Sequence, residues 1–278
     1  MCWTFLKNLF KKKEEITEEE IIEGTIENEK DTEVVVPEPE VEEPIEETIP
    51  ALPPTPEEDA LLGNGQKDLV VLIDNGHASS TPGKYSPLFE DGTRFYEWKF
   101  NRDVVAALVP MLEKENIKHE IITPEENYDV KLNVRATRAN SYCKKYGAAN
   151  CLFISVHGNA FGNGTQWEKP GGWSVWTSRG ETKADPIAKL FYEEAEKILP
   201  KYGFTVRNGV VQGGGNAGPD YEDNFTVLAR TSCPAILTEN LFYTNRKEVE
   251  WMMSEEGINA IALIHLNGIK RVIAERKK

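Results

Sequence analysis

The sequence predicts an α/β fold, with one mostly parallel, twisted sheet flanked by helices and preceded by a disordered acidic N-terminal tail. Short continuous apolar runs, typical of strands covered on both faces, predict the sheet. Longer segments with helical apolar spacing alternate with these runs, as is typical of parallel sheets with flanking helices. The tail is predicted by residues 14–59, which hold 19 acidic residues and one basic residue, Lys30.

The charge is unevenly distributed along the 278 residues. The net charge is -14, but residues 14–59 contribute -18 and the lysines of residues 1–13 contribute +4, so residues 60–278 sum to zero. The acidity therefore belongs to the tail and says little about the substrate. It also argues against a nucleic-acid partner, because phosphate binding needs a basic surface. No apolar run approaches the ~20 residues that a membrane helix requires.

The N-terminal region divides into two parts. In residues 1–13 the lysines follow a short apolar stretch, which is the wrong order for a secretory signal. This basic-amphipathic segment could contact an anionic membrane surface, or it is a frayed terminus. Residues 14–66 are rich in Glu and Pro and contain no aromatic residue, so we expect a disordered tether. The alternative for this part is an acidic interaction arm.

The body, residues 67–278, begins with a continuous apolar run that predicts a strand over residues 68–74. A Gly/Ser/Pro-rich loop follows to about residue 93. Helical spacing then predicts a helix over residues 97–115, in which Pro110 should produce a kink or an early end. A second strand over residues 118–123 and a second helix over residues 130–146 continue the alternation.

The second half of the body repeats the pattern. Its predicted elements are strands at 151–156 and 172–176, a helix at 183–199, strand candidates at 226–229 and 235–238, and helices at 246–253 and 258–274. The four cysteines, Cys2, Cys143, Cys151 and Cys233, form no CxxC pair or zinc-finger spacing. We therefore expect reduced thiols and no disulfide framework.

Polar side chains follow the predicted strands of this body. His77 follows the first strand, His157 the third and Glu239 the strand at 235–238, while Glu97 opens the first helix. Sheets of this kind bind ligands beyond the carboxyl ends of their strands. His119 and His265 lie within a strand and a helix, where we expect structural roles.

These residue types match a catalytic zinc site, which uses three protein ligands and leaves one position open. His77, Glu97 and His157 would supply two nitrogens and one oxygen. Asp74 could orient the ring of His77, and Glu239 could accept a proton from the attacking water. Spacings of 20 and 60 residues carry little weight alone, so a set of satisfied structural residues stays open as the alternative.

Five short motifs resemble the zinc-dependent N-acetylmuramoyl-L-alanine amidases of the amidase 3 type, in the same order and across about residues 68–274. The motifs are Asp74-Asn-Gly-His77; Glu97 with Asn101; Leu132 with Arg135 and Ala139-Asn140; Ser155-Val-His-Gly-Asn-Ala160; and Glu239 with Phe242, Asn245 and Glu248.

The resemblance implies that His77, Glu97 and His157 bind one Zn²⁺ and that Glu239 is the catalytic glutamate. It implies that residues 67–278 are a catalytic domain that cleaves peptidoglycan between N-acetylmuramic acid and the L-alanine of the stem peptide. Three further positions match the family as substrate-binding or supporting residues: Asn159, Asn245 and Arg207, the last with Asn208 interposed before its glycine. The chain departs from the family in the loop at 78–96, which lacks the usual double Gly, in the insert at 161–172, and in the run Gly213–Gly215.

Two other functions stay open at this point. One is a zinc peptidase that cuts within the stem peptide, and the other is an inactive cell-wall-binding module. The family implies action on the cell wall, in the periplasm or outside the cell. Without a recognisable signal peptide, we expect a phage lysin or an enzyme with an unusual export route. We also expect a monomer.

Overall fold

The computed structural model describes residues 68–209 and 218–278. The basic segment at 1–13, the tether at 14–66, Cys2 and the run Gly213–Gly215 lie outside the described residues. None of the helices in the described part combines the length and the apolar character needed to cross a bilayer.

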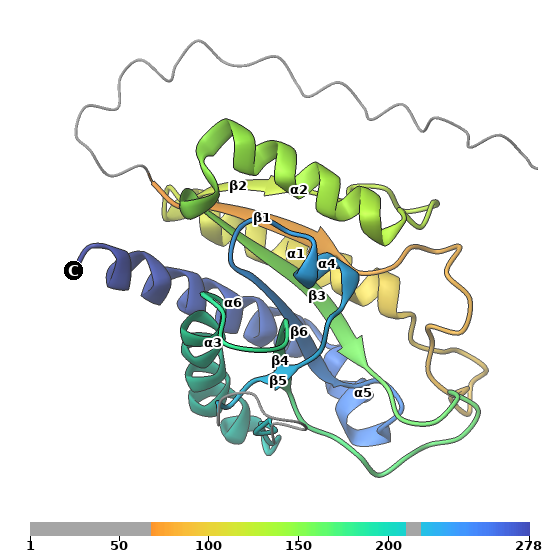
Figure 1. Ribbon diagram of the computed structural model, residues 1–278. Coiled ribbons are helices and arrows are strands. Elements are labelled where there is room, and N and C mark those ends of the chain that lie inside the picture. The colour runs from red at the N-terminus through yellow and green to blue at the C-terminus, as the bar shows by residue number, and fades with distance from the viewer. Residues whose placement is uncertain (1–67, 210–217) are drawn as a thin grey trace, which may run out of the picture. The chain divides into compact units, whose positions relative to one another are not determined.

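Six strands in the described residues form one sheet in the order β2-β1-β3-β6-β4-β5 (Figure 1). They are β1 Val70–Asn75, β2 Lys118–Ile121, β3 Cys151–Asn159, β4 Ser174–Thr177, β5 Tyr221–Glu222 and β6 Ala235–Phe242. Strands β2, β1, β3 and β6 run parallel, and β4 pairs antiparallel with β6. The predicted single, mostly parallel sheet is therefore confirmed.

Helices cover both faces of this sheet (Figure 1). They are α1 Glu97–Lys114, α2 Leu132–Tyr146, α3 Asp185–Ile198, α4 Thr226–Ala229, α5 Arg246–Met252 and α6 Glu255–Arg276, with 3-10 turns η2 Ala148–Asn150 and η3 Leu199–Tyr202. Residues of α1, α3 and α6 share one hydrophobic core, and residues of α2 and α4 share a second core.

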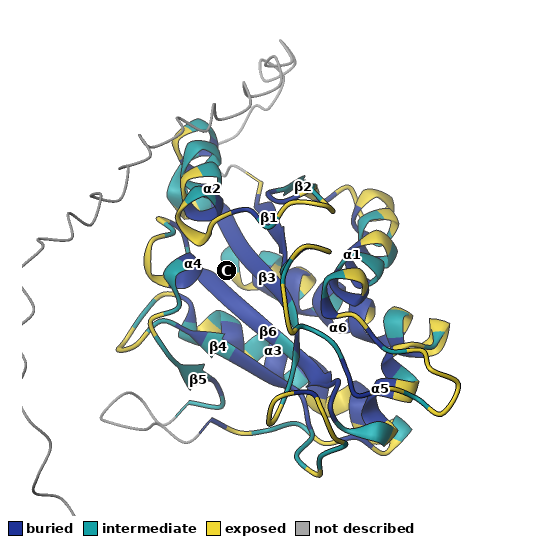
Figure 2. Ribbon diagram, turned by 90° about the vertical axis from the view of Figure 1, so that its right-hand side faces the viewer, coloured by how far each residue is buried: buried dark blue, intermediate teal, exposed yellow. Residues whose placement is uncertain are grey.

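The apolar run of β1 shows why the central strands carry no alternation of polar residues. Val71 and Ile73 belong to the core with α1 and α6, whereas Val70 and Leu72 belong to the core with α2. Successive side chains of a strand point to opposite faces, so a strand covered on both faces is apolar at every position. Figure 2 shows the resulting burial along β1, β3 and β6.

Two local predictions are wrong. Residues Thr226–Ala229 form the helix α4 and not a strand. Four residues are too few to distinguish the two periods, and the burial of Val227 and Leu228 against the α2 side decides the outcome. Helix α1 also continues past Pro110 to Lys114, so the early end is wrong. Pro110 is solvent-exposed.

Two central strands extend further than predicted. Strand β3 continues to Asn159 and β6 continues to Phe242, so His157 and Glu239 lie within strands and not after them. A register shift between His157 and Asn159 interrupts the pairing of these strands. Such bulges redirect side chains near active sites, and this one lies at the polar end of the sheet.

Candidate metal centre

The carboxyl ends of β1, β3 and β6 bring the predicted ligands together. His77 lies two residues after β1, and His157 is paired in register with Glu239 across β3 and β6. Glu97 is the first residue of α1, which begins at the same edge of the sheet. Side chains separated by up to 162 positions in the sequence, from His77 to Glu239, therefore meet at one site.

The backbone around His77 is held in an uncommon conformation. His77 has φ 60, in the left-handed region, which costs a residue with a side chain about 1–3 kcal/mol. Gly76 anchors it, because its N–H donates to Val156 O at 3.1 Å and its carbonyl accepts from Asn101 Nδ2 at 3.0 Å. A Cβ at position 76 would lie 2.4 Å from Cε1 of His157, so only glycine fits between the two histidines.

The ligand atoms of three side chains converge. Glu97 Oε1 lies 2.9 Å from His157 Nδ1 and 3.4 Å from His77 Nε2. One nitrogen or oxygen of each of these residues lies within 4.8 Å of the others. Tetrahedral zinc with bonds of ~2.0–2.1 Å places neighbouring ligand atoms roughly 3.3 Å apart. The donor set and its spacing therefore fit a zinc ion.

The protonation of His77 and Glu97 also suits a metal. Burial lowers the pKa of His77 to about 4, although Glu97 opposes the shift. The ring is neutral at pH 7 and retains a lone pair for coordination. Burial would raise the pKa of Glu97, but the hydrogen bond to His157 and the nearby histidines outweigh burial and lower it. Glu97 is therefore an ionised carboxylate.

Glu239 differs from Glu97 in its environment. Its Oε2 is buried and has no hydrogen-bond partner in the described part of the chain. Burial raises the pKa of Glu239 to about 7, with Glu97 adding to the increase and His157 opposing it. A carboxyl group that titrates near neutral pH can both accept and return a proton under working conditions. A carboxyl group in this position is chemically able to act as a general base.

Asp74 is bound differently from the prediction. Its carboxylate accepts hydrogen bonds from Thr123 Oγ1 at 2.9 Å, Arg135 Nη1 at 2.9 Å and Ser155 Oγ at 2.6 Å, with none from His77. Burial would raise its pKa, but Arg135 and the two hydroxyl groups lower it. Asp74 therefore stabilises the packing of β1 on β3 and does not orient the His77 ring.

The other predicted residues lie around this edge of the sheet. Asn159 Oδ1 accepts from Ala160 N at 2.8 Å, at the end of β3. Asn245 caps α5, since its Oδ1 accepts from Lys247 N and Glu248 N. The guanidinium of Arg207 lies 5.1 Å from the ring centres of both Tyr221 and Phe242, and its charge acts on Glu239. The contacts of Asn159 and Asn245 are with nearby backbone groups, so these two residues stabilise the loops at this edge of the sheet.

Three nearby residues were not identified from the sequence. The Tyr243 phenol is buried, and burial together with the charges of Glu97 and Glu239 raises its pKa. Asn240 Nδ2 donates to His157 O at 2.9 Å and fixes the backbone that carries this ligand. The charge of Lys84 acts on His77, Glu97 and Glu239. Asn240 and Tyr243 lie inside the motif that begins at Glu239 and ends at Glu248, whereas nothing in the sequence pointed to Lys84.

The remaining histidines and the described cysteines lie elsewhere. His119 is in the edge strand β2, and His265 is buried in α6, where its ring nitrogens contact Thr238 Oγ1 at 2.9 Å and Ile261 O at 2.8 Å. Their predicted structural roles agree with these positions. Cys143, Cys151 and Cys233 are buried free thiols, as predicted for these three.

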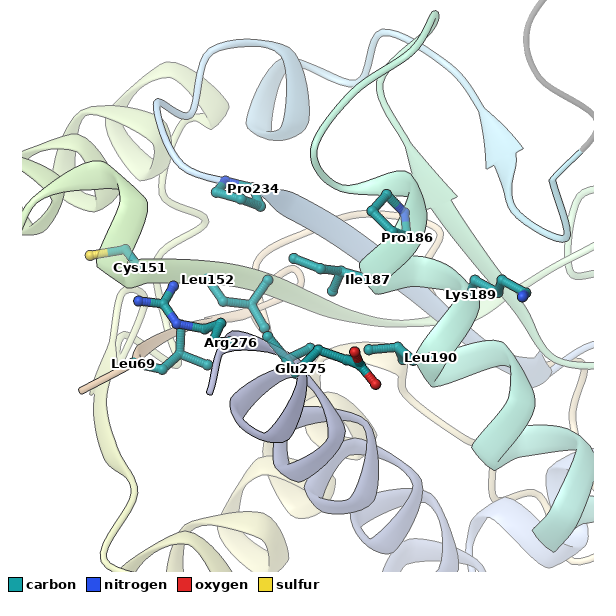
Figure 3. Close-up of a pocket in the computed structure, with 11 residues that line it drawn as sticks. Leu69, Cys151, Leu152, Pro186, Ile187, Lys189, Leu190, Pro234, Glu275 and Arg276 are labelled. Carbon is teal, nitrogen blue, oxygen red and sulfur yellow. The ribbon is translucent and has the colours of Figure 1, made fainter. Parts of the chain in front are cut away.

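A cavity of about 460 Å³ lies where the central strands begin, at the opposite end from the ligands (Figure 3). Leu69, Leu152, Ile187 and Leu190 are among its mainly apolar lining residues. No cluster of metal-ligating side chains is found there in the described residues. We therefore assign the chemistry to the carboxyl ends of the strands, where the polar groups converge.

Comparisons with known proteins agree with this arrangement. A family described as N-acetylmuramoyl-L-alanine amidase, Amidase_3, matches residues 71–271. An endolysin of Bacillus phage SPP1 is 28% identical over 213 residues, which are 75% of this chain and 68% of that protein. N-acetylmuramoyl-L-alanine amidase CwlM of Bacillus licheniformis is 28% identical over 208 residues, 72% of this chain and 67% of that protein.

Solved structures share the fold. The catalytic domain of CwlV, an amidase from Bacillus (Paenibacillus) polymyxa var. colistinus, has a TM-score of 0.57 at 21% identity, over 74% of this chain and 98% of that one. An N-acetylmuramoyl-L-alanine amidase from Clostridium difficile 630 has a TM-score of 0.59 at 22% identity, over 75% and 98%.

Proposed function

Because this chain belongs to the Amidase_3 family of N-acetylmuramoyl-L-alanine amidases, and is therefore a peptidoglycan amidase, we propose that its active site is a zinc centre with a glutamate base. His77, Glu97 and His157 would hold the ion. When bound, zinc supplies Lewis-acid activation of water and of the amide carbonyl. The bond cleaved joins the lactyl group of muramic acid to the L-alanine of the stem peptide.

Glu239 performs the proton transfers in this proposal. In its ionised form it removes a proton from the attacking water, whose oxygen forms a bond to the amide carbon. It then delivers that proton to the departing nitrogen, so the C–N bond breaks and yields a carboxylate on the muramoyl side and a free amine on L-alanine. The pKa of about 7 lets one group serve both steps near neutral pH.

The observation that carries this proposal is the geometry of the four side chains. Three ligand atoms lie within 4.8 Å of one another, and Glu239 faces them from the paired position on β6 with a buried, unbonded oxygen. A purely structural carboxyl group would have hydrogen-bond partners for its buried atoms. An unpartnered oxygen beside three converging ligand atoms instead supports a role in the reaction.

Mass spectrometry of digested peptidoglycan tests the bond and the metal together. The protein should release peptides with a new N-terminal L-alanine, and chelation should abolish this release until zinc is restored. Glu239→Gln should lower turnover by at least ~100-fold and retain zinc, whereas the exposed Glu113→Gln should change neither. New ends within the stem peptide would instead identify a peptidase, and full activity of Glu239→Gln would refute the base.

For the N-terminal region we propose that residues 14–66 form a tether and that residues 1–13 contact an anionic membrane surface. A fully extended tether over residues 14–66 would span roughly 160 Å at ~3 Å per residue. The enzyme would then reach the cell wall from a membrane-bound terminus. A chain that begins at residue 61 should keep its activity and lose binding to anionic vesicles; retention of both would count against the tether.

A further inference from the structure

Lys84 has a fixed backbone position beside the proposed zinc ligands. The turn at Pro82 and Gly83, with Gly83 at φ 74, directs the chain back toward α1. The carbonyl of Lys84 accepts a hydrogen bond from the N–H of Glu97 at 3.0 Å. A β-bridge between Tyr85 and Tyr96 continues this pairing. The Cα of Lys84 is thereby held next to the first residue of α1.

The ammonium group of Lys84 acts on the centre of the site. Its positive charge lowers the pKa of His77, of Glu97 and of Glu239. The lysine is partly buried, yet among residues 68–209 and 218–278 its ammonium group has no hydrogen bond or ion pair. It therefore lies within electrostatic range of the reacting groups and retains its donors.

The neighbouring cations differ from Lys84 in this respect. The guanidinium of Arg135 is buried and pairs with Asp74 and Asp129. The guanidinium of Arg207 lies over the rings of Tyr221 and Phe242, which hold it in place. Of these three cations, Lys84 is therefore the one that has neither a carboxylate partner nor an aromatic ring beside its charge in the described structure.

The charges at the site favour an anionic substrate. The carboxylates of Glu97 and Glu239 together carry two negative charges, enough to balance one divalent ion. Lys84 and Arg207 then add positive charge beside these groups. Positive charge close to a site attracts anions and repels cations.

We propose that Lys84 binds a free carboxylate of the stem peptide and so makes the enzyme selective for acidic stem peptides. This inference rests on the proposed amidase function. A lysine ammonium carries three donors on a flexible stem and forms strong, charge-assisted hydrogen bonds to carboxylate. The interaction lies on the amine side of the scissile bond, because the stem peptide is the leaving group. Lys84 is a specificity-determining residue in this scheme and takes no part in proton transfer.

Two muramoyl peptides test the proposal. They differ only in whether the residue after L-alanine bears a free carboxylate or a carboxamide. The wild-type enzyme should prefer the carboxylate, and Lys84→Met should lower kcat/KM for it about tenfold, mainly through KM, with a distinctly smaller loss for the carboxamide peptide. Lys84→Arg should restore most of the preference. The matched control is Lys183→Met, which removes a lysine charge from an exposed position and should change neither value.

Equal losses for both peptides would overturn the proposal, because Lys84 would then act on the reacting groups and not on the carboxylate. A wild-type enzyme without preference would also overturn it. Raised ionic strength should weaken the preference of the wild-type enzyme, and this measurement does not depend on the folding of any variant.

Direct binding separates this inference from the amidase function. Isothermal titration of both peptides into Glu239→Gln, with and without Lys84→Met, requires no turnover. Carboxylate-selective binding that disappears in the Lys84→Met variant supports the inference. It does so even if the wild-type enzyme cuts neither peptide, a result that would refute only the amidase function. Hydrolysis by the wild-type enzyme without such selectivity would leave the amidase function standing and refute the role of Lys84.

Discussion

Replacing Glu239 with glutamine should stabilise the metal-free protein while it abolishes turnover. Burial raises the pKa of Glu239 from 4.5 to about 7, so the folded state resists ionisation that the unfolded state accepts. As the pH rises from 4.5 through 7, this carboxyl group therefore lowers the free energy of unfolding. A pKa of about 7 in place of 4.5 corresponds to roughly 3 kcal/mol above pH 7, an upper value because the residue is partly open to solvent. Glutamine keeps the shape without the charge.

Urea unfolding in the presence of a chelator measures this difference. At pH 5 the wild-type protein and Glu239→Gln should differ by less than about 1 kcal/mol, and at pH 8 the variant should be more stable by up to roughly 3 kcal/mol. The exposed Glu113→Gln should follow the wild-type curve at both pH values. A constant difference between Glu239→Gln and the wild-type protein from pH 5 to pH 8 would show that Glu239 does not titrate near neutrality, and the argument for its role as base would fail.

Three other changes probe the site and its support. Gly76→Ala places a Cβ 2.4 Å from the His157 ring and should weaken zinc binding at least ~10-fold in a competition titration with a chromophoric chelator. Arg135→Met leaves the Asp74 carboxylate buried without its cation and should cost about 3–5 kcal/mol in urea unfolding. Burial lowers the pKa of His265 to about 4 in the folded state. Below pH 6.5 the unfolded state therefore binds a proton at this histidine that the folded state does not bind. Acidification from pH 6.5 to 4 should therefore cost the wild-type protein roughly 3 kcal/mol more than His265→Gln.

Each of these changes has a control. Gly180→Ala meets no neighbouring atom but has φ 89, so it should cost stability and leave zinc affinity unchanged. Arg179→Met breaks an exposed ion pair with Asp223 and should cost less than about 1 kcal/mol. For His265→Gln the control is internal, because the prediction concerns only the difference between its stability and that of the wild-type protein across the pH range. Normal zinc affinity in Gly76→Ala would refute the close packing of the histidines.

The sequence predicted most of the elements because their signals are local. The apolar run at residues 69–73 and the helical spacing from Glu97 reflect which faces of each element are covered, and the folded structure keeps both elements. The two-residue strand β5 has no such signal, and the four residues Thr226–Ala229 fit either period. Packing against α2 decided that segment.

For the site, the sequence by itself determined the chemical types: two imidazoles, a carboxylate that opens a helix and a second carboxylate on a later strand. Only the tertiary structure decided their distances and their protonation. The convergence of His77, His157 and Glu239 depends on the order and register of β1, β3 and β6, which join segments far apart in the chain. The raised pKa of Glu239, the bonding of Asp74 to Arg135 and the position of Lys84 beside Glu97 all arise from burial and from neighbours that are distant in sequence. Electrostatic energies depend on distance and solvent exposure in the folded chain, and neither can be read from residue order.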